Sequence, residues 1–205
     1  RLVIFTNGKG EASINLQPGE APASDEVTMV LMAVLPLAAH PDAKTVAVIG
    51  MGSGQTSHVM LGSESLEQLD TIEIEACVIE AARHFGPHVE RVFADDRSRI
   101  FIDDARSFLS THNARYDIIV AEPSNPWVSG VSSLFSAEFY ELAARHLRPR
   151  GVLAQWLQLY EIEPRLVASV MAALVRSFPE YTIYATDNAN MVILARKGGS
   201  IGELR

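Results

Sequence analysis

Short apolar runs rich in β-branched side chains recur along this chain. The clearest stands at 45–49, where four of the five residues are β-branched and none is charged, and related runs stand at 69–74 and 116–121. A continuous β-branched run is typical of a strand that is covered on both faces, as in a parallel sheet. The pattern therefore predicts an α/β core organised around residues 45–49.

Stretches with helical periodicity alternate with these runs. Further strands are expected at 99–102, 152–157, 182–185 and 191–195. Helices are expected at 24–39, 56–61, 76–85, 105–110, 137–146 and 164–178. This alternation, with short connections, predicts a doubly wound, mostly parallel seven-stranded sheet with helices on both faces. The turn-prone residues 187–190 make the last two strands an antiparallel edge.

The N-terminal segment has a different pattern. Two apolar runs at 2–5 and 12–16 flank the turn-prone segment 7–10, which predicts a small β-hairpin. A lone hairpin is marginally stable in water. We therefore expect it to pack on the main domain or on a second copy of the chain, which would make a homodimer.

A linker containing Pro18, Gly19 and Pro22 follows the hairpin, and Ser24 is expected to cap the next helix. The chain thus divides into three parts. They are the hairpin with its linker at 1–22, a main domain at 23–196 and a polar tail at 197–205.

A glycine-rich turn directly follows the first core strand. Gly50, Gly52 and Gly54 allow a sharp bend and a close approach to a ligand. Glu73 ends the next strand about 20 residues later, a spacing at which a carboxylate reaches ribose hydroxyls. The dinucleotide fingerprint requires its last glycine where Gln55 stands, which favours a single adenosyl group. The alternative is a tight turn that binds nothing.

Two more carboxylates follow predicted strands. Glu122 follows the strand 116–121, and the winding of the sheet should reverse between this strand and 45–49, so Gly50 and Glu122 would share one cleft. The alternative for Glu122 is an exposed acid on a surface loop. Asp104 would either accept from the exocyclic amine of an adenine or cap the helix that begins at Ala105.

Composition limits the classes of partner. With 205 residues, 48% of them hydrophobic, the chain can bury the core of one domain. A net charge of −8 argues against a nucleic-acid partner. The acidic balance either favours a cationic substrate such as an amine or simply supports solubility.

The cysteine and histidine content and the hydropathy of the chain argue against a disulfide, a metal site and a membrane span. The single Cys77 cannot form an intramolecular disulfide and is expected to be a core thiol. The six histidines show no metal-ligand spacing, so no metal site is expected. No apolar run reaches the roughly 18 residues of a membrane span, and we expect a cytoplasmic protein.

Taken together, the motifs resemble the spermidine synthase family of polyamine aminopropyltransferases, whose core is the class I S-adenosylmethionine-dependent methyltransferase fold, a Rossmann-like fold. The most specific segment is Leu-Phe-x-x-Glu-Phe-Tyr at 134–140, and the Glu-Pro-Ser-Asn-Pro-Trp loop at 122–127 is similar to a divergent bacterial branch of the family. The resemblance also covers 48–54, 72–75, 103–106, 116–120 and 151–155.

The resemblance implies roles for individual residues. Glu73 would hold the ribose hydroxyls, and the three glycines would approach the amino-acid portion of the co-substrate. Asp104 and Ala105 would contact the adenine. The co-substrate would be S-adenosylmethionine or its decarboxylated form, with no tightly bound cofactor. Glu122 would orient and deprotonate an attacking amine.

The amine half of the site departs from the family pattern. Asn125 stands where the family has a second aspartate that binds the amine, and Trp127 would be an aromatic anchor in the same loop. Ser53 replaces an acid of the glycine loop, and Met29 stands among residues where the family has a tyrosine and polar partners. The resemblance thus retains the nucleoside half of the site and leaves the acceptor open.

Three functions follow from these patterns. The first is an aminopropyltransferase that acts from decarboxylated S-adenosylmethionine on an amine. The second is a methyltransferase that acts on another small acceptor. The third is a non-catalytic adenosyl-binding module.

Overall fold

One mixed sheet forms the centre of the protein. The computed structural model describes residues 1–6, 9–124, 130–160, 162–199 and 201. Within these residues, the sheet has seven strands in the order β5-β4-β3-β6-β7-β9-β8. The strands are β3 (Thr45–Ile49), β4 (Gln68–Glu73), β5 (Ser98–Ile102), β6 (Tyr116–Ala121), β7 (Leu147–Gln158), β8 (Glu180–Ala185) and β9 (Asn190–Arg196).

The pairing of the strands fixes where a ligand can bind. β3 pairs in parallel with both β4 and β6, and β9 is antiparallel to β7 and β8. The chain moves from β3 to β4 and β5, then returns to the other side of β3 as β6. This order confirms the predicted doubly wound sheet, and the winding reverses between β3 and β6, where ligands of such sheets bind.

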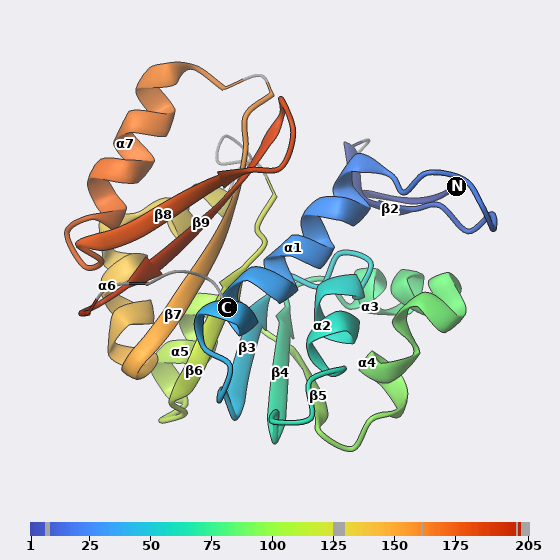
Figure 1. Ribbon diagram of the computed structural model, residues 1–205, viewed down its shortest axis with the longest axis horizontal. Helices are drawn as coiled ribbons and strands as arrows, with labels where there is room; N and C mark the ends of the chain where they lie inside the picture. The colour runs from blue at the N-terminus through green and yellow to red at the C-terminus, as the bar shows by residue number, and fades with distance from the viewer. Residues whose placement is uncertain (7–8, 125–129, 161, 200, 202–205) are drawn as a thin grey trace.

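Helices cover both faces of the sheet. The helices are α1 (Ser24–Ala39), α2 (Gln55–Met60), α3 (Ala76–Ala82), α4 (Glu90–Ala94), α5 (Ala105–Thr111), α6 (Ala137–His146) and α7 (Pro164–Leu174). Val46 and Val48 of β3 share a buried cluster with α1 to α4, whereas Ala47 and Ile49 share one with α5 to α7. Figure 1 shows α1 and α2 in front of the sheet and α5 and α6 behind it. None of the described helices is both long and apolar enough to cross a membrane.

The N-terminal hairpin packs on the main domain. Strands β1 (Leu2–Thr6) and β2 (Lys9–Ile14) form a separate antiparallel pair. Ile4, Ala12 and Ile14 of this pair are buried in the same cluster as α1. The hairpin therefore contributes to the core beside α1, and its role in a homodimer stays a prediction.

The start of α1 differs from the prediction. The N-cap residue is Ala23, and Ser24 is the first helical residue. The Ser24 hydroxyl donates to Asp187, and this helix has no side-chain cap hydrogen bond at its N-cap position. Instead, the Glu26 carboxylate accepts from the backbone amide of Ala23 at 3.1 Å. The prediction for Ser24 was wrong because the helix begins at Ser24 itself, one residue before a Ser24 cap would allow.

Other differences have local causes. The predicted helix 76–85 ends as an α-helix at Ala82 and continues as the 3₁₀ segment η1 (Arg83–Val89). Gly86, with a φ of 56°, makes a kink inside this segment. The helix α4 that follows was not predicted. Cys77 is exposed on α3, so it is not the core thiol that we expected.

Candidate functional site

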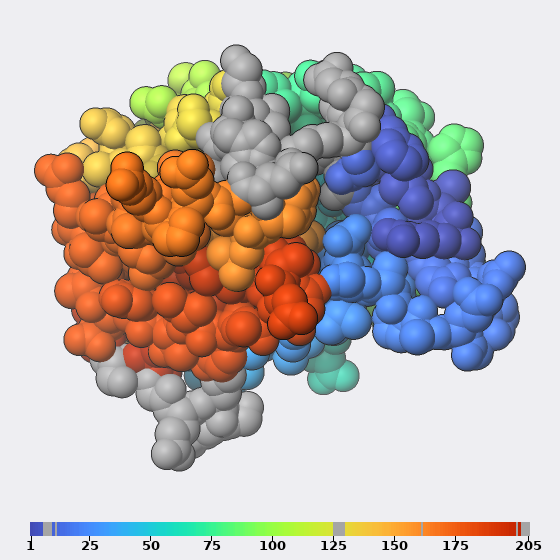
Figure 2. Space-filling view, turned by 90° about the horizontal axis from the view of Figure 1, so that it is seen from above, coloured from blue at the N-terminus to red at the C-terminus, as the bar shows by residue number. Residues whose placement is uncertain are grey.

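A cavity of about 520 Å³ opens where the strands β3 to β6 end. This volume lies in the range of small-molecule sites. Of the residues predicted from sequence, six line it: Gly50, Gly52, Glu73, Asp104, Ala105 and Glu122. In Figure 2, which shows the molecule from above, the hairpin and the start of α1 form one side of the view, and the segments from β7 onward form the other.

The glycine turn brings β3 and β6 into close contact. Gly50 has a φ of 87°, and a β-carbon there would lie 2.7 Å from the carbonyl oxygen of Glu122. Gly52 has a φ of 51°, and its β-carbon position lies 3.5 Å from the β-carbon of Ala12 in the hairpin. Gly54 is not among the cavity residues, because its β-carbon position faces Met51 and Val92 instead. It serves as the left-handed N-cap of α2.

Glu73 is fixed at the end of β4. One carboxylate oxygen accepts from the backbone amide of Met51 at 2.8 Å, and the other accepts from the amide of Glu75 at 2.9 Å. Burial raises the pKa of the Glu73 carboxyl, and these backbone hydrogen bonds oppose part of the increase. The side chain therefore ties the glycine turn to β4 while it lines the cavity.

Asp104 caps a helix and lines the cavity as well. Its Oδ1 accepts from the backbone amide of Ser107 at 2.9 Å, which is the capping arrangement at the start of α5. Ala105, the first residue of that helix, is buried against the cavity. Capping is therefore observed for Asp104, and the contact of Asp104 and Ala105 with an adenine stays a prediction.

Glu122 is a partly buried residue at the end of β6. Its Oε1 is shielded from solvent and has no hydrogen-bond partner among the described residues. Burial raises the pKa of the Glu122 carboxyl to about 8, although the Thr56 hydroxyl lowers it in part. A carboxyl group with one shielded, unpaired oxygen is costly when ionised. Such a group is ready to pair with a cation or to take up a proton.

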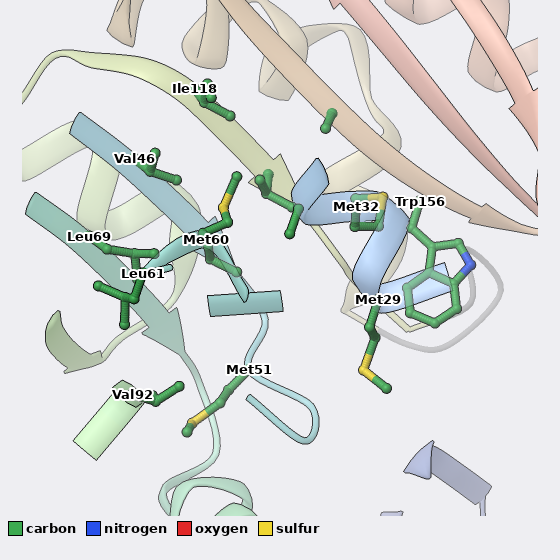
Figure 3. Packing of buried hydrophobic residues seen from close by; sticks show 14 of the residues in the cluster. Met29, Met32, Val46, Met51, Met60, Leu61, Leu69, Val92, Ile118 and Trp156 are labelled. Carbon is green, nitrogen blue, oxygen red and sulfur yellow. The ribbon is translucent and has the colours of Figure 1, made fainter. Parts of the chain in front are cut away.

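Trp156, which we did not assign to the site, and Met29, named above only as a departure from the family pattern, line the cavity together with Glu122. Ala121 pairs with Gln155, so the next positions on these parallel strands, Glu122 and Trp156, are neighbours on one face. Met29 of α1 lines the same cavity. In Figure 3, the Met29 side chain and the Trp156 indole lie at the same edge of the buried cluster. The sequence does indicate the side on which Trp156 lies. Alternate residues of a strand face the same side of the sheet, and Val152 and Ala154 belong to the buried cluster that includes α1.

The predicted amine contacts Asn125 and Trp127 lie outside the described residues. The loop continues in the structure as the short 3₁₀ segment η2 (Val131–Phe135). Val131 and Leu134 of this segment line the cavity. They add apolar surface that was not assigned from sequence.

The described charged residues that line the cavity are all acidic. Among the described residues that line it, five carry carboxyl groups: Glu73, Glu75, Asp103, Asp104 and Glu122. None of these described lining residues is Lys, Arg or His. A site with this charge favours a cationic ligand.

Comparison with known proteins assigns the family. Residues 27–189 match the model of the spermine/spermidine synthase domain. The chain belongs to the spermine/spermidine synthase family. Its curated relatives include a putrescine N-methyltransferase of Nicotiana attenuata, 31% identical over 74% of this chain and 41% of the relative. A polyamine aminopropyltransferase of Caldicellulosiruptor saccharolyticus is 30% identical over 75% of this chain and 55% of the relative.

Solved members of the spermine/spermidine synthase family share the fold. A spermidine synthase in complex with the transition state analogue AdoDATO matches with a TM-score of 0.77 and 24% identity, over 85% of this chain and 61% of that one. The Rossmann-like methyltransferase fold predicted from sequence is therefore confirmed. The chain spans about half the length of the curated relatives named above.

Proposed function

We propose that this protein transfers an aminopropyl group from decarboxylated S-adenosylmethionine to an amine. The observation that carries the proposal is the Glu122 carboxyl, which is buried without a hydrogen-bond partner for its Oε1 at the edge of an acidic cavity. The reaction needs a carboxylate at the point where a cationic amine meets a sulfonium. Glu122 supplies a carboxylate of this kind.

The proposed step balances with Glu122 as the proton acceptor. The bound ammonium first gives a proton to the Glu122 carboxylate, which leaves a neutral amine. The amine nitrogen then attacks the propyl carbon bonded to sulfur, the carbon–sulfur bond breaks, and its electron pair leaves with the sulfur of methylthioadenosine, so the new secondary amine carries the positive charge. A base whose pKa lies near the working pH is effective in this role, and the pKa of Glu122 is about 8.

The predicted nucleoside contacts are consistent with such a donor. Glu73 is held at the end of β4 by two backbone amides, so its orientation towards ribose hydroxyls would be fixed before a ligand enters. Gly50 and Gly52 leave backbone rather than side chain against the cavity. The acidic lining favours a donor that carries an ammonium and no carboxylate.

Methyl transfer from intact S-adenosylmethionine is the second candidate. It is favoured by the relatives that act as putrescine N-methyltransferases, such as the protein of Nicotiana attenuata. The intact donor brings a carboxylate into the cavity, and the described lining offers it no basic side chain. This electrostatic difference is the reason that we rank aminopropyl transfer first.

Two measurements test the proposal. The purified protein is incubated with either donor and an amine, and methylthioadenosine and S-adenosylhomocysteine are quantified as the products of aminopropyl and methyl transfer. Calorimetry then compares the affinities of the two donors. Methylthioadenosine together with tighter binding of the decarboxylated donor supports the proposal, whereas S-adenosylhomocysteine together with tighter binding of the intact donor supports methyl transfer.

The variant Glu122→Gln separates an enzyme from a binding module. It keeps the size of the side chain and removes the base, so turnover should fall by about 10²–10⁴-fold while the donor still binds. Donor binding without either product in the unmodified protein would instead support a non-catalytic adenosyl-binding module.

A further inference from the structure

The sheet order divides the carboxyl groups of the cavity into two sets. Glu73 and Asp104 lie at the ends of β4 and β5, on one side of β3, whereas Glu122 lies at the end of β6, on the other. Neighbouring strands are about 4.8 Å apart, so the ends of β4 and β6 are separated by roughly 10 Å. If the first set faces the adenosyl group, as the proposed function requires, Glu122 is left for the acceptor.

The part of the cavity wall that Met29 and Trp156 form is apolar. The Met29 side chain and the Trp156 indole lie in the buried cluster, with 1% and 5% of their surface exposed. The polar atom of the indole is already used, because Nε1 donates to Oδ1 of Asn190 at 2.9 Å. The Met29 sulfur is likewise engaged, since it accepts from the Ser53 hydroxyl at 3.1 Å. This wall offers an incoming ligand carbon surface and no free acceptor.

Three acids near this wall already accept hydrogen bonds from other groups. Asp25 accepts from the Ser13 hydroxyl at 3.0 Å. Glu26 accepts from two backbone amides at 3.1 and 3.2 Å. Asp187 accepts from the backbone amide of Ala189 at 2.7 Å. None of these three acids lines the cavity, so they do not provide a second site for an ammonium group there.

We propose that the acceptor is a primary monoamine with an apolar alkyl or aryl body, and that Met29 and Trp156 select it. This inference rests on the proposed function, because it assumes that the amine approaches Glu122. A diamine would place its second ammonium against Met29 and Trp156, where it would lose hydration without gaining a partner from the described residues of this wall. A hydrocarbon chain of the same length would gain contact area instead.

Putrescine and n-pentylamine form the matched pair for the test, because they differ only in a terminal ammonium or methyl group. Calorimetry measures the affinity of each amine for the protein saturated with methylthioadenosine, so the comparison does not depend on turnover. We expect n-pentylamine to bind at least about tenfold more tightly than putrescine, since an unpaired buried ammonium costs more than one lost hydrogen bond. The same order is expected for kcat/KM in the methylthioadenosine assay.

A charge-introducing variant tests the selecting residue. Met29→Glu places a second carboxylate on the wall and should shift the preference at least about tenfold towards putrescine. The matched control is Val34→Glu on the same helix, where the side chain is 44% exposed and does not line the cavity. This control should leave the preference unchanged. Circular dichroism shows whether each variant is folded.

Each result of these experiments decides a different claim. Tighter binding of putrescine than of n-pentylamine by the unmodified protein overturns the inference, even if aminopropyl transfer itself is observed. Equal shifts in Met29→Glu and Val34→Glu overturn the assignment of Met29. Absence of methylthioadenosine with both amines overturns the proposed function, whereas the binding comparison still decides the preference of the pocket. If Met29→Glu does not fold, the comparison on the unmodified protein stands alone as the test.

Discussion

The β-carbon position of Gly50 lies 2.7 Å from the carbonyl oxygen of Glu122. This separation is shorter than any that a real β-carbon tolerates, so only glycine fits at the end of β3. The same contact places the backbone of the glycine turn directly against the residue that carries the candidate base. The turn and the base are therefore one structural unit.

Gly50→Ala should destabilise the protein and weaken donor binding. The added methyl group meets backbone atoms of Glu122 and must also adopt a φ of 87°. We expect a loss of about 2–4 kcal/mol in the free energy of unfolding, measured by urea denaturation. Gly19→Ala is the control, because Gly19 has a φ of 85° but open space around it. It should cost only about 1–2 kcal/mol, and an equal loss in both variants would contradict the role of the contact.

The unliganded protein should lose stability as the pH rises from about 4.5 to about 8. The pKa of Glu122 is raised from 4.5 to about 8 in the folded state, so its stabilising contribution is complete below 4.5 and is lost as the pH approaches 8. The loss should be on the order of 4–5 kcal/mol at most, since each unit of pKa shift corresponds to about 1.4 kcal/mol. Glu122→Gln cannot ionise and should flatten this part of the stability curve. Parallel curves for the two proteins would show that the carboxyl group is not buried as described.

Binding of a cationic donor should release a proton from Glu122. A sulfonium or ammonium nearby favours the ionised carboxylate and lowers its pKa below the value of about 8 in the unliganded protein. At pH 7, calorimetry in two buffers with different ionisation enthalpies should therefore report release of up to about one proton. Glu122→Gln should bind the donor with the same heat in both buffers. The same result for the unmodified protein would mean that the donor does not approach this group.

Tyr116→Phe should weaken the core between β4 and β6. The Tyr116 hydroxyl donates to Oδ2 of the fully buried Asp70 at 2.7 Å, and Arg99 donates to both oxygens of the same carboxylate. Loss of a hydrogen bond to a buried charged group costs about 1.5–3 kcal/mol in the free energy of unfolding. Tyr181→Phe is the control, because Tyr181 is 43% exposed on β8 and its replacement should have little effect. Similar losses in both variants would contradict the prediction.

Much of the fold could be predicted because its central strands are short apolar runs, which fit only the buried interior of a sheet. The run at 45–49 matches β3 at both ends, and the helix 137–146 matches α6. Other boundaries were less accurate. β7 begins at Leu147 rather than at 152, since Arg150 adopts a φ of 67° that lets the strand start before Gly151. A positive φ at a residue other than glycine has no clear signal in one sequence.

The candidate site was predicted only in part, for a physical reason. Glu73, Asp104 and Glu122 each end a predicted strand, so the parallel order of the sheet brings them to one cavity. Trp156 and Met29 contribute through packing, and which apolar side chains border a cavity depends on strand register and helix placement. Gly54 has the residue type of the motif, but its β-carbon position faces Val92 rather than the cavity.

The exposed thiol of Cys77 offers a practical opportunity. It is the chain's sole cysteine, and it stands on α3 between Glu75 and Val78, which both border the cavity. A maleimide fluorophore would therefore attach at one defined position without any engineered substitution. Quenching or a spectral shift of that dye could report nucleoside entry in real time, which gives the protein a built-in handle for screening donors and amines.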